Sequence, residues 1–318
     1  MALLTTTAGW FPKPVEVRRA RWRFAEGDVE EDELRAVEAR ATQQALALQL
    51  ELGLDVLVEG QLDRGDMAAF LAGKLEGLEP GGLVRCFGNR YYRKARIVGE
   101  IAWPGPLTVG AWQAAQRQVA RPVKAVLTGP YTLMDWSFDE HYGSREACCL
   151  ALAEALRQET AALLAAGVHE IQLDEPAISA RPEEMALAAE ALGRVCQPLR
   201  GKARSWAHVC YGSWLPVVDE LFALPVDGLL LEMTGSGRAL AERLGDLPGD
   251  KLLAAGVVDV QNDDIEDVAT IRGRAERLLE RVPSDRLWLA PDAGLRTLTA
   301  NVAAAKLRAL VQAAATLG

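Results

Sequence analysis

Eight short apolar runs alternate along the chain with longer stretches in which hydrophobic residues recur at helical spacing. Short, continuous apolar runs are typical of strands that are buried on both faces of a parallel sheet. The runs are residues 3–8, 54–58, 123–127, 170–173, 204–209, 228–231, 252–258 and 287–289. The clearest helical stretches are residues 31–52, 144–166, 182–199, 265–282 and 298–317. This alternation predicts an α/β fold, a single (β/α)8 TIM barrel that takes up residues 1–318 as one domain.

The stretch between the second and third runs is too long for an ordinary loop of such a barrel. Residues 62–122 contain a helical pattern at 67–78 and two further runs, 84–90 and 96–102, that predict a hairpin. Long excursions of this kind are often functional. We therefore expect a helix and a hairpin that cover part of the barrel mouth.

Polar residues follow most of the predicted strands. They are Gln61 after the second run, Asp174 after the fourth, His208 and Cys210 at the fifth, Glu232 after the sixth, Asp259 and Gln261 after the seventh, and Asp292 after the eighth. The carboxyl ends of barrel strands meet at one mouth, where such barrels place their sites. Strands usually end in polar residues, but that alone accounts poorly for a histidine, a cysteine and several carboxylates directed at one mouth.

Composition narrows the class of protein. Half of the residues are hydrophobic and a quarter are charged, as in soluble globular proteins. The formal net charge of −9 and the lack of a basic stripe argue against a nucleic-acid-binding surface. The five cysteines, few and odd in number, predict no disulfide framework and therefore a reducing cytoplasm. The sequence shows neither a signal-peptide pattern nor an apolar run as long as a membrane span.

His208 and Cys210 are two residues apart in a predicted strand, so their side chains point to the same face. Glu232 ends the next apolar run and would lie beside them. Imidazole, thiolate and carboxylate are zinc ligands, and three protein ligands leave an open position for chemistry. Iron fits a similar set, although the thiolate favours zinc. A buried structural cysteine beside a hydrogen-bonded core histidine is the alternative interpretation.

Several ordered motifs resemble the cobalamin-independent methionine synthases. They are VKAVLTGPYTLMDWSF at 123–138, IQLDEPA at 171–177, LDVLV at 54–58, HVCY at 208–211, PDAGL at 291–295 and LVQAA at 310–314. The similarity runs nearly from end to end over the catalytic half of that family. The chain is therefore identified as a divergent member of the short, single-barrel type.

The resemblance implies a chemistry. Zinc held by His208, Cys210 and Glu232 would bind an acceptor thiol such as homocysteine and keep it as the reactive thiolate. The methyl donor would be a methyl-folate or, as in short members, a methyl-corrinoid. A separate protein that delivers the methyl group would then be a partner.

The resemblance also implies roles for other residues. Asp174 matches the carboxylate that receives the amino group of homocysteine. Trp136 matches an aromatic residue that flanks the pterin, with packing at the barrel rim as the alternative. Asp259 falls in an Asp-x-His motif of the family. The catalytic candidates are Asp174, Asp259 and Gln261, and the substrate-binding candidates are Trp10, Gln61, Asp174, Trp136 and Arg90.

The chain departs from the family pattern at four positions. Ala293 replaces the cysteine that is the fourth zinc ligand, and Gln261 replaces a histidine near the methyl-transfer centre. Gln61 replaces a glutamate that helps to bind the homocysteine ammonium, and Trp10 replaces a serine near the amino-acid substrate. Asp292 is an alternative fourth ligand. We expect a three-ligand metal site and an altered acceptor pocket.

Two other functions stay open. A metal with two free positions would also suit a lyase, an aldol-type step or alkyl transfer from an epoxide to a thiol. A non-catalytic member would bind a folate, a corrinoid or an amino acid. The three lost family residues favour this last alternative, whereas His208, Cys210, Glu232 and Asp174, all retained, speak against it.

Overall fold

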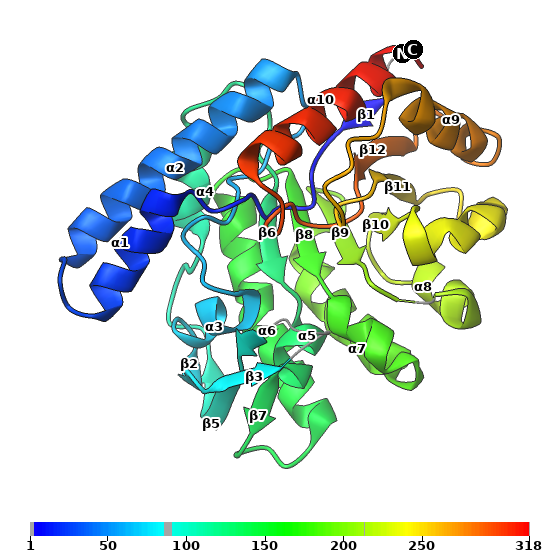
Figure 1. The fold of residues 1–318 in the computed structure, drawn as a ribbon. Helices are drawn as coiled ribbons and strands as arrows, with labels where there is room; N and C mark the ends of the chain where they lie inside the picture. The colour runs from blue at the N-terminus through cyan, green and yellow to red at the C-terminus, as the bar shows by residue number, and fades with distance from the viewer. Residues whose placement is uncertain (1–2, 86–90, 213, 318) are drawn as a thin grey trace.

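A curled parallel sheet forms the centre of an α/β fold, with helices around its outside (Figure 1). The computed structural model describes residues 3–85, 91–212 and 214–317. In these residues the sheet has seven strands in the order β1-β12-β11-β10-β9-β8-β6, and every pairing is parallel. The strands are β1 Leu4–Thr5, β6 Ala125–Thr128, β8 Glu170–Asp174, β9 Arg204–Val209, β10 Gly228–Glu232, β11 Leu252–Val258 and β12 Leu287–Pro291.

The second predicted strand is a bridging segment in the structure. Leu57 forms an isolated parallel bridge with Val123. The Val56 amide donates to the Thr5 carbonyl at 3.0 Å, and the Leu57 amide donates to the Pro122 carbonyl at 2.9 Å. Residues 54–58 therefore contact β1 on one side and, on the other, the residues directly before β6 through the backbone.

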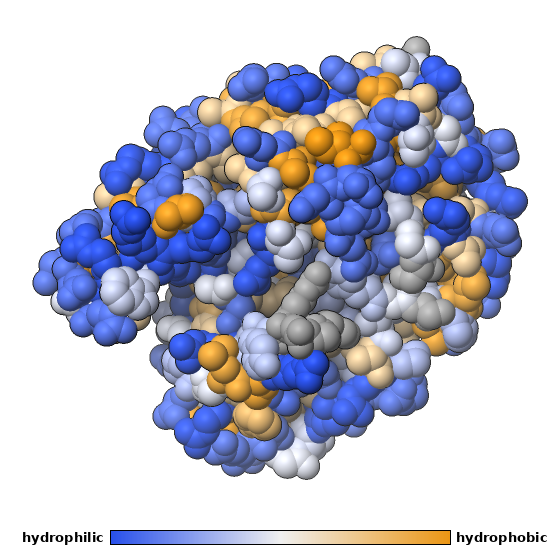
Figure 2. Space-filling model, viewed as in Figure 1, coloured by the Kyte–Doolittle hydropathy of each residue, from blue (hydrophilic) through white to orange (hydrophobic). Residues whose placement is uncertain are grey.

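The predicted helices are present with small changes at their ends. They are α2 Glu31–Leu52, α6 Arg145–Ala165, α7 Met185–Cys196, α9 Val268–Leu279 and α10 Ala300–Ala315, with α1 Val15–Ala25, α4 Val109–Gln116, α5 Pro130–Asp135 and α8 Val218–Phe222 in addition. Side-chain caps begin three of them, because Ser144, Asp267 and Thr299 each accept a backbone N–H of the first turn. Most of the surface in the space-filling view is hydrophilic, with apolar residues in separate patches (Figure 2). No helix in the described part of the chain is long and apolar enough to cross a membrane.

The inner face of the sheet is filled by its own side chains. One cluster of buried residues comes from successive strands and the bridging segment: Ala8, Val56, Trp206, Leu230, Ala254, Trp288 and Ala290. The rings of Trp206 and Trp288 lie 4.8 Å apart. Because side chains alternate along a strand, residues two places away from this layer point inward as well. The inward-facing residues at the carboxyl ends therefore lie above a packed floor.

The excursion between the second and third runs differs from its prediction. The helix α3 is shorter, Met67–Ala72, and Glu76–Glu79 forms the strand β2. Gly77 has φ 79°, and a Cβ there would lie 2.3 Å from the Glu100 carbonyl oxygen, so this close approach requires glycine. A residue with that backbone conformation cannot continue a helix.

The predicted hairpin between 84–90 and 96–102 is wrong in its pairing. The strand β5 Ala95–Ala102 pairs antiparallel with β2 and parallel with β7 Ser137–Asp139. The strand β3 Leu83–Arg85 instead pairs with β4 Tyr91–Arg93. Residues 86–90 of the predicted run lie outside the described residues. Apolar alternation marked the strands, but their partners depend on contacts far apart in sequence.

Candidate active site

A pocket of about 340 Å³ opens at the carboxyl ends of the sheet strands. Its volume lies in the range of small-molecule sites. Five predicted site residues line it: Trp10, Trp136, Asp174, His208 and Cys210. Ala293 lines it too, together with Met67, Tyr91, Tyr92, Tyr211 and Arg296. Residues from distant parts of the chain thus meet in one aromatic pocket, which is also lined by one imidazole, one thiol and the carboxylates of Asp66 and Asp174.

His208 and Asp174 form a buried pair. They lie opposite each other on β9 and β8, and Nδ1 of His208 is 3.0 Å from Oδ1 of Asp174. Burial by itself lowers the pKa of His208, but Cys210 and Asp174 outweigh it and raise the pKa to about 10. Nε2 of His208 is buried and has no hydrogen-bond partner in the described part of the chain. One ring nitrogen is therefore oriented by a carboxylate while the other is left for a ligand.

Glu232, at the end of β10, lies beside Cys210, which directly follows the neighbouring strand β9. Leu231 of β10 pairs with Val209 of β9, so the residues that follow them end the two strands side by side. Tyr211 adopts the left-handed region at φ 61°, and its amide donates to Oε2 of Glu232 at 3.2 Å. A non-glycine residue in this region is strained, and such strain is concentrated at functional sites. Glu232 is buried but does not line the pocket.

The imidazole, thiol and carboxylate groups at these strand ends are of the types that bind zinc. Their side chains do not converge on a single metal position. Among the residues that the structure describes, no group of three or more His, Cys, Asp and Glu side chains is close enough to hold a metal. His208 nevertheless has the arrangement of a metal ligand, because a carboxylate holds its second nitrogen. His208 and Cys210 line the same pocket as Ala293.

Asp292, the alternative fourth ligand, is occupied elsewhere. Its carboxyl group accepts a hydrogen bond from the Thr234 hydroxyl and one from the Met233 amide at 3.3 Å. Burial raises the pKa of Asp292 to about 8, with the charge of Glu232 adding to the effect. Serving as a ligand would require Asp292 to give up both hydrogen bonds.

Trp10 and Gln61, two predicted substrate-binding residues, are both buried, but only Trp10 lines the pocket. The Trp10 ring is flanked by two cations, with Lys13 Nζ 5.0 Å and the Arg296 guanidinium 4.9 Å from the ring centre. Gln61 is 1% exposed, has φ 53°, and its Oε1 has no hydrogen-bond partner in the described residues. Gln61 does not line the pocket, although it closely follows the bridging segment, residues 54–58.

Two other candidates, Asp259 and Gln261, lie away from the pocket. Both carboxylate oxygens of Asp259 are used in its own turn, by the Gln261 amide at 2.7 Å and the Asn262 side chain at 2.6 Å. Gln261 is exposed, and neither it nor Asp259 lines the pocket. Arg90 lies outside the described residues.

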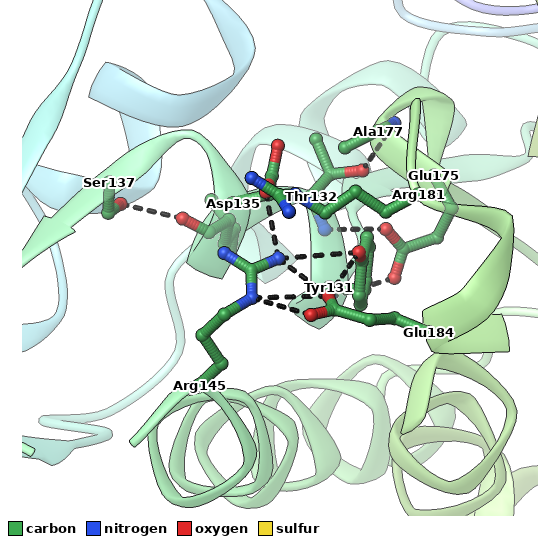
Figure 3. A network of polar contacts seen from close by, with 10 residues as sticks. Tyr131, Thr132, Asp135, Ser137, Arg145, Glu175, Ala177, Arg181 and Glu184 are labelled. Atoms are coloured by element: carbon green, nitrogen blue, oxygen red, sulfur yellow. Dashed lines mark hydrogen bonds and ion pairs between the residues drawn. The ribbon is translucent and has the colours of Figure 1, made fainter. Parts of the chain in front are cut away.

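Glu175 is a positioning residue that the sequence motifs did not single out. Its carboxylate accepts the amides of Tyr131 at 3.0 Å and Thr132 at 2.7 Å, at the start of α5 (Figure 3). The side chain passes so close to Gly129 that a Cβ there would lie 2.2 Å from the Glu175 carboxyl carbon. Burial raises the pKa of Glu175 to about 7. Asp174 thus faces the pocket while Glu175 fixes the turn beside it.

A polar network holds the other end of α5. Arg145 contacts Glu184 at 2.7 Å and Asp135 at 2.8 Å, and the Tyr131 hydroxyl donates to Glu184 (Figure 3). Trp136 directly follows Asp135 as the C-cap residue of the helix. Its ring lies 4.8 Å from that of Tyr92. The helix therefore places Trp136 on the pocket wall, against an aromatic residue of the excursion that was not predicted.

Comparison with known proteins assigns the chain to a family. Residues 3–316 match the family described as "Cobalamin-independent synthase, Catalytic domain". The chain belongs to this family. It is 34% identical to a 5-methyltetrahydropteroyltriglutamate–homocysteine methyltransferase from Cronobacter sakazakii, over 98% of this chain and 43% of that protein. This cobalamin-independent synthase domain therefore spans less than half the length of that relative.

Two solved structures share the fold of the synthase domain. A B12-independent methionine synthase from Shewanella sp. W3-18-1, in complex with selenomethionine, matches with a TM-score of 0.89 and 25% identity, covering 100% of this chain and 98% of that one. A Listeria monocytogenes protein studied as a vitamin-B12-independent methionine synthase matches with a TM-score of 0.81 and 21% identity, covering 99% of each chain. The second likeness shows the fold alone.

Proposed function

We propose that the chain is a zinc-dependent methyltransferase that methylates a small thiol resembling homocysteine. The observation that carries this proposal is the buried His208–Asp174 pair: Nε2 of His208 has no hydrogen-bond partner in the described residues, and His208 lines the same pocket as Cys210. The names of the relatives support the reaction type. The acceptor sulfur forms a bond to the methyl carbon while the donor nitrogen loses that carbon and takes up a proton.

His208, Cys210 and Glu232 would hold the zinc ion. A bound zinc ion keeps the acceptor thiol in its thiolate form at neutral pH. Asp174 accepts the His208 Nδ1–H through Oδ1 and lines the pocket, so it is placed to bind the ammonium of an amino-acid acceptor. Asp259 and Gln261 remain candidates only if the 259–262 turn opens toward the pocket.

The donor is a methyl-folate. The Cronobacter relative is named for a methylated pteroyltriglutamate, and Trp136 and Tyr92 form an aromatic wall suited to a flat pterin. A methyl-corrinoid donor conflicts with the cobalamin-independent family and is not proposed. Delivery of the methyl group by a separate protein stays a prediction.

Three further predictions complete the proposal. Residues 54–58 serve as the eighth strand and close the sheet into a (β/α)8 barrel, which is supported by their backbone contacts with β1 and with residues 122–124 directly before β6. Residues 1–318 form one domain. The protein works in a reducing cytoplasm, which suits the free cysteines Cys148, Cys149, Cys196 and Cys210.

The test is product formation from homocysteine and 5-methyltetrahydropteroyltriglutamate, with methylcobalamin as the comparison donor. We expect the methylated thiol to form with the folate, and His208→Ala to abolish it. Lys306→Met is the matched control, since Lys306 is buried against Glu266 away from the pocket. Turnover with methylcobalamin alone, or no turnover over a broad panel of thiols, would contradict the proposal.

A further inference from the structure

A buried lysine lies below the pocket on the inner face of the sheet. Lys124 directly precedes β6 and is 2% exposed. Its Nζ donates to the Thr7 carbonyl at 2.9 Å and to Oε1 of Gln172. Burial lowers the pKa of Lys124 to about 8, while the carboxylates of Asp174, Glu170 and Glu59 act in the opposite direction. A cation in such a place requires partners, and the inner face supplies them.

A continuous chain of hydrogen bonds connects Lys124 with the candidate active site. Gln172 pairs with Trp206 of the inner cluster, so Gln172 and Asp174 both face inward from β8. Nε2 of Gln172 donates to the Ala8 carbonyl at 2.7 Å and to Oδ1 of Asp174 at 2.6 Å. Oδ1 of Asp174 in turn lies 3.0 Å from Nδ1 of His208. Three side chains, Lys124, Gln172 and Asp174, thus form a continuous hydrogen-bonded path to the imidazole of His208.

The chemistry of these groups sets the direction of every hydrogen bond. An ammonium group only donates, so Lys124 requires the amide oxygen of Gln172 on its side. The amide nitrogen must then face Asp174 and the Ala8 carbonyl, both of which accept. Asp174 receives two donors on Oδ1, the amide of Gln172 and the Nδ1–H of His208. Nε2, which has no hydrogen-bond partner in the described part of the chain, is consequently the ring nitrogen that can bind a ligand once its proton has left.

We propose that Lys124 and Gln172 are positioning residues that, through Asp174, fix the ring orientation and the Nδ1–H of His208. The proposal rests on the proposed function only in assigning a metal to Nε2. Lys124 and Gln172 contact neither the pocket nor the candidate ligands, so they act through Asp174. Outer partners of this kind tune metal affinity by roughly 10- to 100-fold in other sites.

Three methionine substitutions test the proposal with matched changes in shape. Gln172→Met removes the donor to Asp174, and Lys124→Met leaves both orientations of the Gln172 amide open. Lys306→Met is the control, since it also removes a fully buried ammonium, one that binds Glu266 and the Asp264 carbonyl. Any loss of stability that results simply from replacing a buried lysine with methionine should occur in the control as well.

The first readout needs no metal. The chain has three histidines, so ¹⁵N-histidine labelling gives few signals, and His208→Ala identifies the relevant one. We expect a protected, hydrogen-bonded Nδ1–H of His208 in the parent protein and in Lys306→Met. The same signal should broaden or vanish in Gln172→Met and Lys124→Met. Because Gln172→Met retains Lys124, it keeps the test valid if Lys124→Met does not fold.

The second readout is zinc affinity, measured by competition with a chromophoric chelator. We expect Gln172→Met and Lys124→Met to weaken zinc binding by about 10- to 100-fold relative to Lys306→Met. An Nδ1–H signal and a zinc affinity in both variants equal to those of the control would overturn the inference. A parent protein that binds no zinc would refute the proposed function instead, and the histidine signal would still decide the positioning role.

Discussion

Gly129 and Glu175 are packed so tightly that no side chain fits between them. A Cβ on Gly129 would lie 2.2 Å from the Glu175 carboxyl carbon. The carboxylate at the same time accepts the two amides that begin α5, the helix that ends at Trp136. One buried side chain therefore connects the carboxylate side of the pocket, at Asp174, with its aromatic wall.

Gly129→Ala should destabilise the protein and displace Trp136. Overpacking of this kind costs about 1–3 kcal/mol, which urea unfolding would measure. Gly110→Ala is the matched control, since Gly110 lies on α4, where a Cβ would meet nothing within 4 Å, and the substitution should gain about 0.5–1 kcal/mol. Equal stabilities of the two variants would show that the Gly129–Glu175 contact has no energetic weight.

Glu175 should also give the stability a particular dependence on pH. Its pKa rises from an ordinary 4.5 to about 7 in the folded chain, because burial disfavours the charged form. The folded chain binds this proton more tightly, so the resulting stability is fully present below pH 4.5 and is lost as the pH rises through 7. Glu175→Gln removes this dependence. Between pH 5 and pH 8 the urea midpoint of the parent should fall by more than that of Glu175→Gln. The same fall in both proteins would contradict the assignment of this pH dependence to Glu175.

Ala293→Cys should tighten zinc binding. Ala293 lines the pocket with His208 and Cys210. The resemblance to the family implies a cysteine ligand at this position. A fourth ligand closes the tetrahedral set that zinc prefers. Ala293→Ser, similar in size but a weak ligand, is the control. We expect a lower zinc dissociation constant for the cysteine variant alone, and an unchanged constant would place Ala293 too far from the metal.

Gln61→Glu should restore affinity for the acceptor's ammonium group. Gln61 is buried, and its Oε1 has no hydrogen-bond partner in the described residues. A carboxylate there would attract a nearby cation more strongly than an amide does. The KM for homocysteine should fall, whereas that for 4-mercaptobutyrate, which lacks the amino group, should not. An equal effect on both acceptors would argue against an ammonium subsite at Gln61.

The strands and outer helices could be predicted because their signals are local. Continuous apolar runs marked β9 and β11 to the residue, and the helical spacing of 31–52 matched α2. The excursion could not be predicted, since β5 pairs with β2, where the close approach of Gly77 to Glu100 leaves no room for a side chain. Pairing of that kind leaves no periodic signal in the sequence.

The site divides in the same way. Motifs at strand ends identified His208, Cys210 and Asp174, and the curl of the sheet brings them to one pocket. Lys124, Gln172 and Glu175 were missed because they resemble ordinary interior residues of strands and turns. Their roles depend on which polar groups face each other across the sheet. Asp259 and Gln261 show the converse, because the local turn uses their polar groups and the family motif gave no sign of that.

The zinc content of the purified protein, of His208→Ala and of Cys210→Ala tests the central claim most directly. We predict near-stoichiometric zinc in the parent and in Lys306→Met after zinc loading and dialysis, and its loss in both ligand variants. A parent protein that retains no zinc, or ligand variants that retain as much as the parent, would contradict a metal centre at His208 and Cys210.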